Sequence, residues 1–304
     1  MGGSGTYMKI VFFGTPDYVL PVLTTVHKKF VTGPGVSPIV AVVTQSPKPV
    51  GRKQILSYSP IDKWAHEHKI PIHYSSKELP IDKVEADLGV LASYGEIIPK
   101  EVINLFPKGI LVIHPSLLPE YRGASPVPAS IMNGDAVTGV TIFKMDEKMD
   151  HGPIVVQSKE DIFPEDTGES LRARLFEKSA RILVETIDPY LNGKIKPKDQ
   201  NHSEATFTSI LKKEDGKVDL KADDPIEIER KFRAYSPWPG IWTLLRLSTS
   251  LETSEGQAQK RLKILKAHLE NDKLVLDEVQ LEGKNPVTYQ QFKEAHPMGE
   301  VATG

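Results

Sequence analysis

The segment KIVFFGTPDYVLPVLTTV (9–26) starts with a short apolar run, turns at a glycine and a proline, and continues with apolar residues at helical spacing. A buried strand, a tight turn and a helix in this order are typical of the first unit of an α/β sheet. Similar apolar runs follow at 39–44, 88–92 and 110–113, separated by helix-like stretches such as 60–68. Strands that alternate with helices predict a doubly wound, mostly parallel sheet.

Further along, the pattern changes. Strands are expected at 140–145 and 153–158, and a long helix at 167–191. A polar stretch with Gly, Pro and several Lys then indicates a linker. After it, a helix-like stretch and three short strand-like segments (242–247, 262–268 and 273–281) predict a small β-barrel. The expected organisation is a remnant of an expression vector at 1–7, an α/β domain at 8–191, a linker at 192–208 and a β domain at 209–304.

Length and composition exclude several classes of protein. The 304 residues carry 38 Lys and Arg against 40 Asp and Glu, and the formal net charge is -2. Two domains are expected, and a nucleic-acid partner would need local basic features because the whole chain is not basic. With no cysteine, thiolate catalysis, disulfides and Cys-ligated metals are excluded. A reducing compartment is compatible with this, so we expect a cytoplasmic protein without a membrane span or a metal.

Basic residues gather in two places. The loop SPKPVGRKQIL (46–56) carries Lys48, Arg52 and Lys53 without an acid, directly after a strand that ends at 44. We expect a flexible loop suited to phosphate groups, although a solvated loop is the commoner meaning of three such charges. The second cluster is Lys260, Arg261, Lys263 and Lys266. If side chains alternate strictly along a strand, the last three of these do not share one face.

The richest motif for chemistry is IHPSLLPEYRG (113–123). His114 follows an apolar strand, and Pro115 and Pro119 bracket the turn that comes next. Ligands of open α/β sheets lie outside the carboxyl ends of the strands, and histidine is the commonest general acid or base near neutral pH. The sequence therefore makes His114 a candidate catalytic residue, with a hydrogen-bonded structural histidine as the alternative.

A second loop, MDEKMDHGP (145–153), offers a carboxylate partner for this histidine. Asp150 could orient or polarise an imidazole, although Asp before a Gly-containing turn is also ordinary turn chemistry. The first turn, FGTPD (13–17), could receive a polar ligand at a helix N-terminus. It has neither a GxGxxG nor a GxxxxGK[ST] pattern, so a dinucleotide or nucleoside triphosphate is not expected there.

Six segments form a combined pattern: FGTPDYVLPVL (13–23), VVTQSPKPVGRK (42–53), ASYGEIIPK (92–100), IHPSLLPEYRGASP (113–126), NGDAVTGVTIFKMDEKMDHGPIV (133–155) and RAYSPWPGIW (233–242). In order and spacing, from Met8 to about Gln280, they resemble the methionyl-tRNA formyltransferase family. The resemblance implies a formyltransferase fold with an OB-like C-terminal barrel, 10-formyltetrahydrofolate as co-substrate and initiator methionyl-tRNA as partner in translation initiation. We also expect a monomer that needs no metal.

The resemblance assigns roles to individual residues. His114 matches the catalytic imidazole, and Asp150 matches the carboxylate that positions it or a water molecule. The turn Ser116, Leu117, Leu118 and Pro119 matches the folate-binding turn, and Tyr94 and Gly95 match a second wall of that pocket. Substrate contacts are implied for Tyr18, which matches an aromatic against the methionine side chain, and for Arg52 and Lys53 in the loop that meets the tRNA.

Two features depart from the family pattern. Val112 stands where the family has an asparagine that helps to hold the oxyanion, and the C-terminal domain looks shorter than the family's barrel. Loss of one oxyanion donor typically costs about 100- to 1000-fold in rate. Three interpretations remain: a slow enzyme, an enzyme in which another donor such as Ser116 or a backbone N–H substitutes, or a folate- or tRNA-binding homologue with weakened catalysis. An amino-sugar formyltransferase is the enzymatic alternative, because its catalytic core would look nearly the same.

Overall fold

The computed structural model describes residues 8–31, 33, 36–51, 53–246, 259–296 and 300–301. The chain divides into two compact units, each assembled from separate stretches of sequence. The first unit comprises Met1–Gly123, Val137–Asp161 and Arg172–Phe207, and the second comprises Ala124–Ala136, Ile162–Leu171 and Thr208–Gly304.

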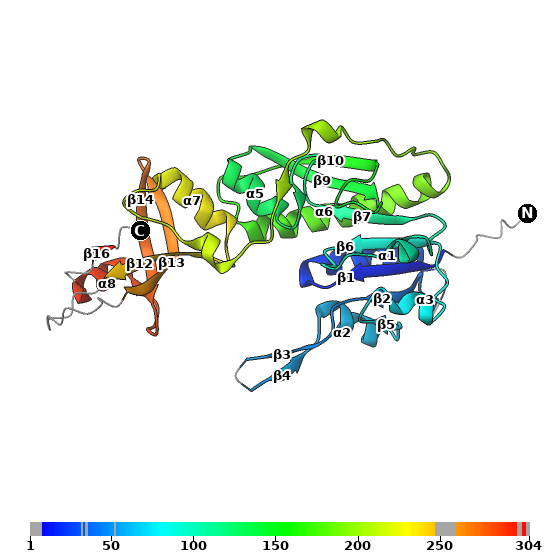
Figure 1. The fold of residues 1–304 in the computed structure, drawn as a ribbon, viewed down its shortest axis with the longest axis horizontal. Helices are drawn as coiled ribbons and strands as arrows, with labels where there is room; N and C mark the ends of the chain where they lie inside the picture. Colours follow the sequence, from blue (N-terminus) through cyan, green and yellow to red (C-terminus); the bar gives the residue numbers. More distant parts are fainter. Residues whose placement is uncertain are drawn as a thin grey trace, which may run out of the picture. The chain divides into compact units, whose positions relative to one another are not determined.

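A seven-stranded sheet forms the centre of the first unit (Figure 1). Its strand order is β10-β9-β7-β6-β1-β2-β5, and the pairs from β7 to β5 are parallel. The last two strands in sequence, β9 and β10, are antiparallel to their neighbours. The mostly parallel sheet predicted from the sequence is confirmed. The strands are β1 (Ile10–Gly14), β2 (Ile39–Val43), β5 (Ile72–His73), β6 (Leu88–Ala92), β7 (Ile110–His114), β9 (Val137–Lys144) and β10 (Ile154–Asp161).

The central strands are apolar because both of their faces are covered. Every residue of β1 and of β7 is buried. Parallel strands of α/β proteins are normally enclosed in this way and consist of continuous apolar runs. On one face, Phe13, Tyr94 and Phe106 meet edge to face, with ring centroids 5.8 and 5.9 Å apart. This packing fixes the ends of β1 and β6, beside which β7 delivers His114.

The main helices of the first unit begin where the sequence predicts. Ser59 caps the helix at 60–67, because its side-chain oxygen accepts a hydrogen bond from the Asp62 N–H, and Pro60 occupies the first turn. None of the described helices is long and apolar enough to cross a membrane. The helical segments are η1 (Asp17–Val19), α1 (Leu20–Phe30), α2 (Pro60–Glu67), α3 (Glu78–Ile81), α4 (Lys100–Ile103), α6 (Gly168–Leu191) and η2 (His202–Glu204).

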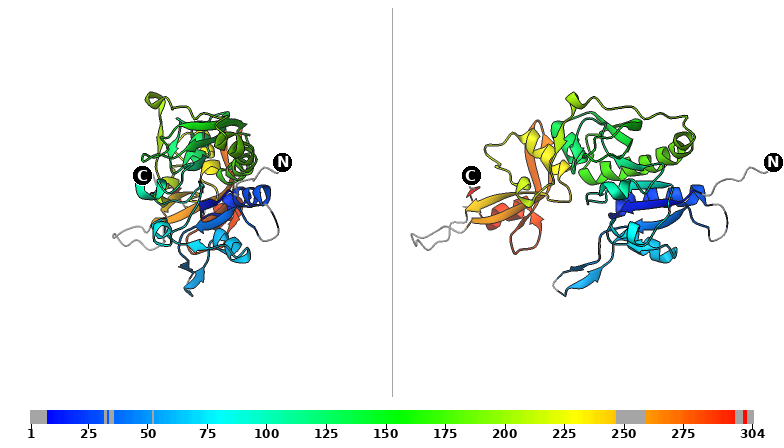
Figure 2. Two further views of the ribbon diagram at one scale, coloured as in Figure 1. Left: turned by 90° about the vertical axis from the view of Figure 1, so that its right-hand side faces the viewer. Right: turned by 45° about the vertical axis from the view of Figure 1, so that its right-hand side comes forward.

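The basic segment after β2 forms a β-hairpin rather than an irregular loop. Strands β3 (Lys48–Val50) and β4 (Ile55–Ser57) pair in antiparallel register. The hairpin extends away from the central sheet in all the views (Figures 1 and 2). Hydrogen bonds between the two strands therefore determine the conformation of this segment, and its charged residues alone did not predict the hairpin.

The second unit is smaller and is built on an antiparallel sheet with the strand order β15-β14-β13-β12-β16. The three predicted strands correspond to β12, β13 and β14, so the smaller C-terminal β domain is confirmed, whereas a closed OB-like barrel stays a prediction. The sheet strands are β12 (Ile241–Arg246), β13 (Gln259–Glu270), β14 (Lys273–Leu281), β15 (Val287–Thr288) and β16 (Glu300–Val301). The unit's helices are α5 (Pro126–Asn133), η3 (Lys213–Gly216), α7 (Pro225–Ala234) and α8 (Tyr289–Ala295), and the short strands β8 (Arg122–Gly123) and β11 (Phe207–Thr208) pair with each other.

Strand β13 contains an irregularity that changes which side chains share a face. The register shifts between Ile264 and Lys266, and Ile264 and Ala267 both pack toward the same apolar cluster. Lys263 and Lys266 are both exposed. The expectation that Arg261, Lys263 and Lys266 cannot share a face is therefore wrong, because an extra residue in a bulge resets the alternation of side chains.

Candidate active site

His114 is the last residue of β7, and the sheet buries it to 5% exposure. It pairs with Thr141 of β9, and the preceding Ile113 pairs with Ala92 at the end of β6. The imidazole Nε2 lies 2.8 Å from the Tyr121 carbonyl oxygen and donates to it when protonated. The ring is thus held by a buried strand on one side and by the loop at 115–121 on the other.

Asp150 lies close to this histidine, a proximity that the sequence left as a hypothesis. It lies in the loop between β9 and β10, and its Oδ2 is 3.6 Å from His114 Nδ1. The same oxygen accepts a hydrogen bond of 2.7 Å from the Gly123 N–H. The distance to the ring is longer than a hydrogen bond, and catalytic hydrogen bonds in free enzymes often tighten only when substrate binds.

The two contacts determine what the imidazole can do. Nε2 faces a carbonyl oxygen and Nδ1 faces a carboxylate, and both of these groups are acceptors. The Tyr121 carbonyl oxygen therefore fixes the ring through Nε2, and Nδ1 is the nitrogen that faces the Asp150 carboxylate.

The turn that follows His114 is fixed by a buried hydrogen-bond network. Thr141 Oγ1 donates to the Ser116 carbonyl oxygen at 2.7 Å and accepts from the Leu118 N–H at 3.0 Å. Gln157 Nε2 donates to the Leu118 carbonyl oxygen at 2.8 Å, and the Ser116 hydroxyl donates to the Glu120 carbonyl oxygen at 2.7 Å. This turn continues through Leu117 and contains a cis Leu118–Pro119 bond.

Tyr94 and Gly95 occupy the end of β6. The Tyr94 ring is 1% exposed, and its hydroxyl accepts from the Ser76 N–H and donates to Glu96 at 3.0 Å. Burial, together with the Glu96 carboxylate, raises the pKa of Tyr94 above its ordinary value, so the hydroxyl stays protonated. Gly95 has a φ of 83°, which glycine adopts without strain. The Tyr94 ring is thus part of the core, and Gly95 lies in the loop after β6.

The predicted substrate residues lie apart along the chain. Tyr18 packs on α6, with its ring centroid 5.0 Å from that of Phe176 and 5.2 Å from the Arg172 guanidinium carbon. Lys53 is exposed at the tip of the β3–β4 hairpin. Arg52 lies outside the described residues.

The sequence did not point to a group of residues that hydrogen bonds connect to the Asp150 loop. Arg122 is 3% exposed, and its Nε and Nη2 donate to Gln200 Oε1 at 3.2 and 2.6 Å. Nη2 also lies 2.8 Å from His202 Nδ1, and the His202 ring stacks on His151 with centroids 3.9 Å apart. Arg122 stands in the motif that drew attention to His114, but Gln200 gave no signal because it lies in a polar stretch of the expected linker.

Val112 lies on β7, two residues before His114, and is 5% exposed. It belongs to the apolar cluster that contains Phe13, Tyr94 and Phe143. Its side chain offers no hydrogen-bond donor, and the Ser116 hydroxyl already donates to Glu120. The structure therefore gives no support to Ser116 as the replacement donor.

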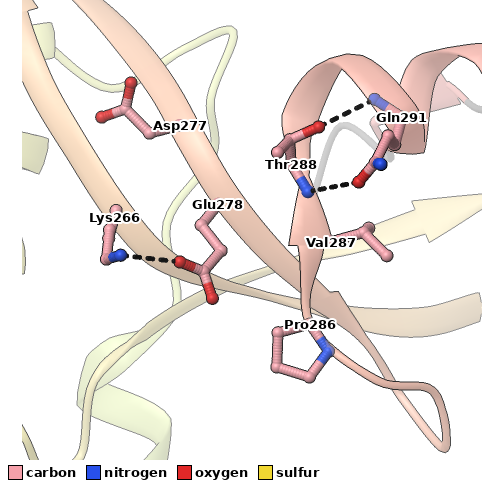
Figure 3. A pocket seen from close by; sticks show the side chains of 7 residues that line it. All are labelled: Lys266, Asp277, Glu278, Pro286, Val287, Thr288 and Gln291. Atoms are coloured by element: carbon pink, nitrogen blue, oxygen red, sulfur yellow. Dashed lines mark hydrogen bonds and ion pairs between the residues drawn. The ribbon is translucent and has the colours of Figure 1, made fainter.

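A groove lies on the surface of the second unit. It is an open groove beside the Lys266–Glu278 ion pair, which measures 3.0 Å (Figure 3). The groove is lined by Lys266, Asp277, Glu278, Pro286, Val287, Thr288 and Gln291.

Within the part of the chain that the structure describes, no group of three or more His, Asp or Glu residues is arranged to hold a metal ion.

Comparison with known proteins gives the class first. A family model described as formyl transferase matches residues 8–187, and one described as formyl transferase, C-terminal domain, matches residues 210–297. The fold and the two matches define a formyl transferase with a separate C-terminal domain.

The similar curated proteins narrow this class. The methionyl-tRNA formyltransferase of Koribacter versatilis is 37% identical and covers 94% of this chain and 95% of its own length. That of Chloroflexus aggregans is 41% identical and covers 79% of this chain and 77% of its own length. The chain belongs to the methionyl-tRNA formyltransferase family.

Solved structures share the fold at lower identity. The methionyl-tRNA formyltransferase from Clostridium thermocellum aligns with a TM-score of 0.56 at 20% identity, covering 90% of this chain and 98% of that one. An N-formyltransferase from Helicobacter canadensis, solved with folinic acid and dTDP-3-aminofucose, aligns with a TM-score of 0.61 at 18% identity, covering 84% of this chain and 95% of that one. One fold thus carries formyl transferases with different acceptors.

Proposed function

We propose that this protein transfers the formyl group of 10-formyltetrahydrofolate to the α-amino group of initiator methionyl-tRNA. The observation that carries the proposal is the proximity of Asp150 to the buried His114 at the end of β7, beside a turn that is fixed by hydrogen bonds. The family of the chain supplies the reaction class. The proposal also takes the protein to be a monomer that acts in the cytoplasm.

In this proposal the amine nitrogen attacks the formyl carbon, and the bond from that carbon to N10 of the folate breaks. The attacking nitrogen loses a proton, and N10 gains one as it leaves. His114 exchanges this proton, because its ring is held between Tyr121 and Asp150 in an orientation suited to proton transfer. Asp150 keeps the ring in that orientation, as carboxylates do in other histidine pairs.

The folate is proposed to bind at the turn of Ser116, Leu117, Leu118 and Pro119. Hydrogen bonds from Thr141 and Gln157 fix the turn, so a ligand would meet a surface of defined shape. Tyr94 and Gly95 are proposed to bound the same pocket. Because Tyr94 is buried, we expect its ring to stay in the core and to support this wall of the pocket from behind, rather than to move across the ligand.

The tRNA is proposed to meet the β3–β4 hairpin through Arg52 and Lys53, and Tyr18 is proposed to contact the methionine side chain. Lys53 is exposed, and the hairpin offers both charge and apolar surface to a partner. Replacing Arg52 and Lys53 with Ala should raise the KM for tRNA and flatten its dependence on salt. An unchanged salt response would argue against this contact.

The domain boundaries are proposed at 8–191 and 209–304, with 192–208 between them. The family matches at 8–187 and 210–297 support this division. On the C-terminal domain, Arg261, Lys263 and Lys266 share one face of β13, which favours contact with phosphates. Lys266 also pairs with Glu278, so part of this charge is already compensated.

Because Val112 offers no hydrogen-bond donor, the rate of formyl transfer is the quantity that tests the proposal. An asparagine at this position would add a donor beside His114, and one oxyanion donor is worth about 100- to 1000-fold in rate. The test compares formylation of charged initiator tRNA by the parent protein and by Val112→Asn, with 10-formyltetrahydrofolate in excess. A parent rate that rises about 100-fold in Val112→Asn would indicate a catalytically weakened transferase.

The other outcomes are equally informative. A fast parent that Val112→Asn does not improve would indicate that a different donor holds the oxyanion. If neither protein formylates tRNA, the same two proteins are assayed with a dTDP-linked amino sugar. Product there would replace the proposal with an amino-sugar formyltransferase, whereas folate binding by calorimetry without product on either acceptor would indicate a binding homologue.

A further inference from the structure

Gln200 is a buried side chain that joins the active-site loop to Arg122. Its Nε2 donates to the carbonyl oxygens of Asp150 and Gly152, at 2.9 and 2.8 Å. Its Oε1 accepts from Nε and Nη2 of Arg122, at 3.2 and 2.6 Å. Only 6% of the residue is exposed, so both ends of the amide act inside the protein. An amide is the side chain that can donate on one side and accept on the other.

The loop that Gln200 holds has an unusual backbone. Asp150 has a φ of 47°, in the left-handed region that residues other than glycine rarely occupy. Gly152 is packed so closely that an added Cβ would collide with the Lys144 carbonyl oxygen. Backbone in such a conformation persists when its surroundings over-determine it. The two hydrogen bonds from Gln200 restrain the carbonyl groups on either side of His151.

The same loop is restrained through its side chain. The Gly123 N–H donates to Asp150 Oδ2 at 2.7 Å, and Gly123 directly follows Arg122. The segment 122–123 thus reaches the Asp150 loop twice, once directly and once through Gln200. The two routes form a closed ring of hydrogen bonds that determines how far the carboxylate stands from His114, a separation of 3.6 Å.

We propose that Gln200 is a positioning residue for formyl transfer: its amide holds the backbone of Asp150 so that the carboxylate stays directed at His114. The inference rests on the proposed function, because it takes the His114–Asp150 pair as the reacting pair. It gives the polar stretch after α6, which belongs to the first unit, a part in the active site. Gln200 acts through Asp150 and touches no substrate in this account.

Two variants separate positioning from simple structural support. Gln200→Glu keeps an acceptor for Arg122 but puts an oxygen where Nε2 donated, so it repels the carbonyl groups of Asp150 and Gly152. Gln200→Met fills a similar volume and also removes the acceptor from the buried Arg122. A structural role predicts that Gln200→Met is the more damaged protein in every respect, because it leaves a buried cation with one acceptor fewer.

The experiment measures kcat, both KM values and the melting temperature for the two variants. We expect kcat to fall about tenfold to a hundredfold in both, because displacement of a catalytic group by about 1 Å can cost that much. Gln200→Glu should keep its KM values, and its melting temperature should fall less than that of Gln200→Met, because the carboxylate still accepts from Arg122. The control is Gln280→Glu in the second unit, where Nε2 donates to the Lys284 carbonyl oxygen at 2.9 Å, and its kcat should not change.

A second comparison tests the route through Asp150. In an Asp150→Asn background, Gln200→Glu should cause little further loss, because residues that act through one another are not additive. The proposal is overturned if Gln200→Glu transfers formyl at the parent rate. It is equally overturned if losses follow the melting temperature, or if the double variant loses the full product of both factors.

A failure of the proposed function can be distinguished from a failure of the proposed role of Gln200. If the parent formylates neither methionyl-tRNA nor an amino sugar, the proposed function fails. Positioning is then read from the side-chain NMR signals of His114, assigned by their loss in His114→Ala. These signals should shift in Gln200→Glu and not in Gln280→Glu, and unchanged signals in both would overturn the inference.

Discussion

The loop that carries Asp150 and the β3–β4 hairpin are both connections within the first unit, yet they are stabilised in opposite ways. The Asp150 loop is tied by hydrogen bonds from Gly123 and Gln200. The hairpin has a backbone ladder of its own, while Val50, Ile55 and Leu56 are 58%, 66% and 56% exposed. The Asp150 loop is thus fixed by hydrogen bonds within the protein, whereas the hairpin leaves apolar side chains in contact with water.

The difference separates two tasks. Catalytic groups need a fixed geometry, because small displacements are costly in rate. A surface for a large partner can stay unburied until the partner covers it, and exposed apolar groups beside basic ones are what such a surface offers. We therefore expect substitutions in the Asp150 loop to lower kcat and substitutions in the hairpin to raise KM.

The largest effect is expected at His114. His114→Ala removes the group that exchanges the proton, and general acid or base catalysis contributes about 100- to 10,000-fold. Steady-state formylation assays should show this loss in kcat, while circular dichroism should give a melting temperature near that of the parent. Retained activity would remove His114 from the mechanism. The Asp150 loop and the hairpin would then no longer differ in their catalytic importance.

Asp150→Asn should come next. The amide keeps the shape of the carboxylate but removes its negative charge, and it puts a nitrogen in place of one oxygen next to Oδ2, the atom that meets both the Gly123 N–H and the His114 ring. We expect kcat to fall more than about tenfold, by analogy with other histidine and aspartate pairs. The measurement is kcat at saturating concentrations of both substrates. A smaller loss would make Asp150 a turn residue and its loop no more catalytic than the hairpin.

The hairpin should show the reverse pattern. Ile55→Ser combined with Leu56→Ser removes apolar surface that an RNA would cover, so we expect the KM for tRNA to rise about tenfold and kcat to stay. The free energy of unfolding should change by less than about 0.5 kcal/mol for each exposed site. Val31→Ser, at a position that is 44% exposed after α1, is the matched control. A fall in kcat with KM unchanged would contradict the division of tasks.

The smallest effect concerns pH. Loss of hydration, followed by the charges of His151 and Arg122, lowers the pKa of His202 below its ordinary 6.5. Because the folded pKa is the lower one, the stabilisation is complete above pH 6.5 and is lost as the pH falls toward the folded value.

Melting temperatures between pH 7.5 and pH 5.5 measure this effect. The parent should lose slightly more stability over this range than His202→Gln does, and His66→Gln on α2 should behave like the parent. The hairpin contains no histidine, so it should add nothing to the difference. Identical curves for the parent and His202→Gln would refute the assignment.

Much of the site was predictable because its chemistry is local in sequence. An apolar strand that ends in His114 predicts a residue at the carboxyl end of a sheet, and the structure places it there. The proximity of Asp150 was a hypothesis, because 36 positions separate the two residues and only the folded loop brings them to 3.6 Å. Gln200 could not be predicted, because a polar residue in a polar stretch gives no sign that it will be buried.

The bulge in β13 is another case of this kind. Alternation along the strand predicts that Lys266 faces away from Lys263, but the register shift after Ile264 turns both to solvent. Hydrogen-bond pairing with β14 decides such a shift, and the sequence of β13 alone does not contain it.

The sequence by itself determined the mostly parallel sheet, the smaller β domain and the family of formyl transferases. Apolar periodicity and contiguous motifs encode these features within short windows. The tertiary structure alone decided that Gln200 connects Arg122 to Asp150, that the segment after β2 pairs as a hairpin, and that Ser116 has already used its hydroxyl proton. Hydrogen bonds between residues that are distant in sequence depend on the positions of whole strands and loops, and those positions are set when the core packs.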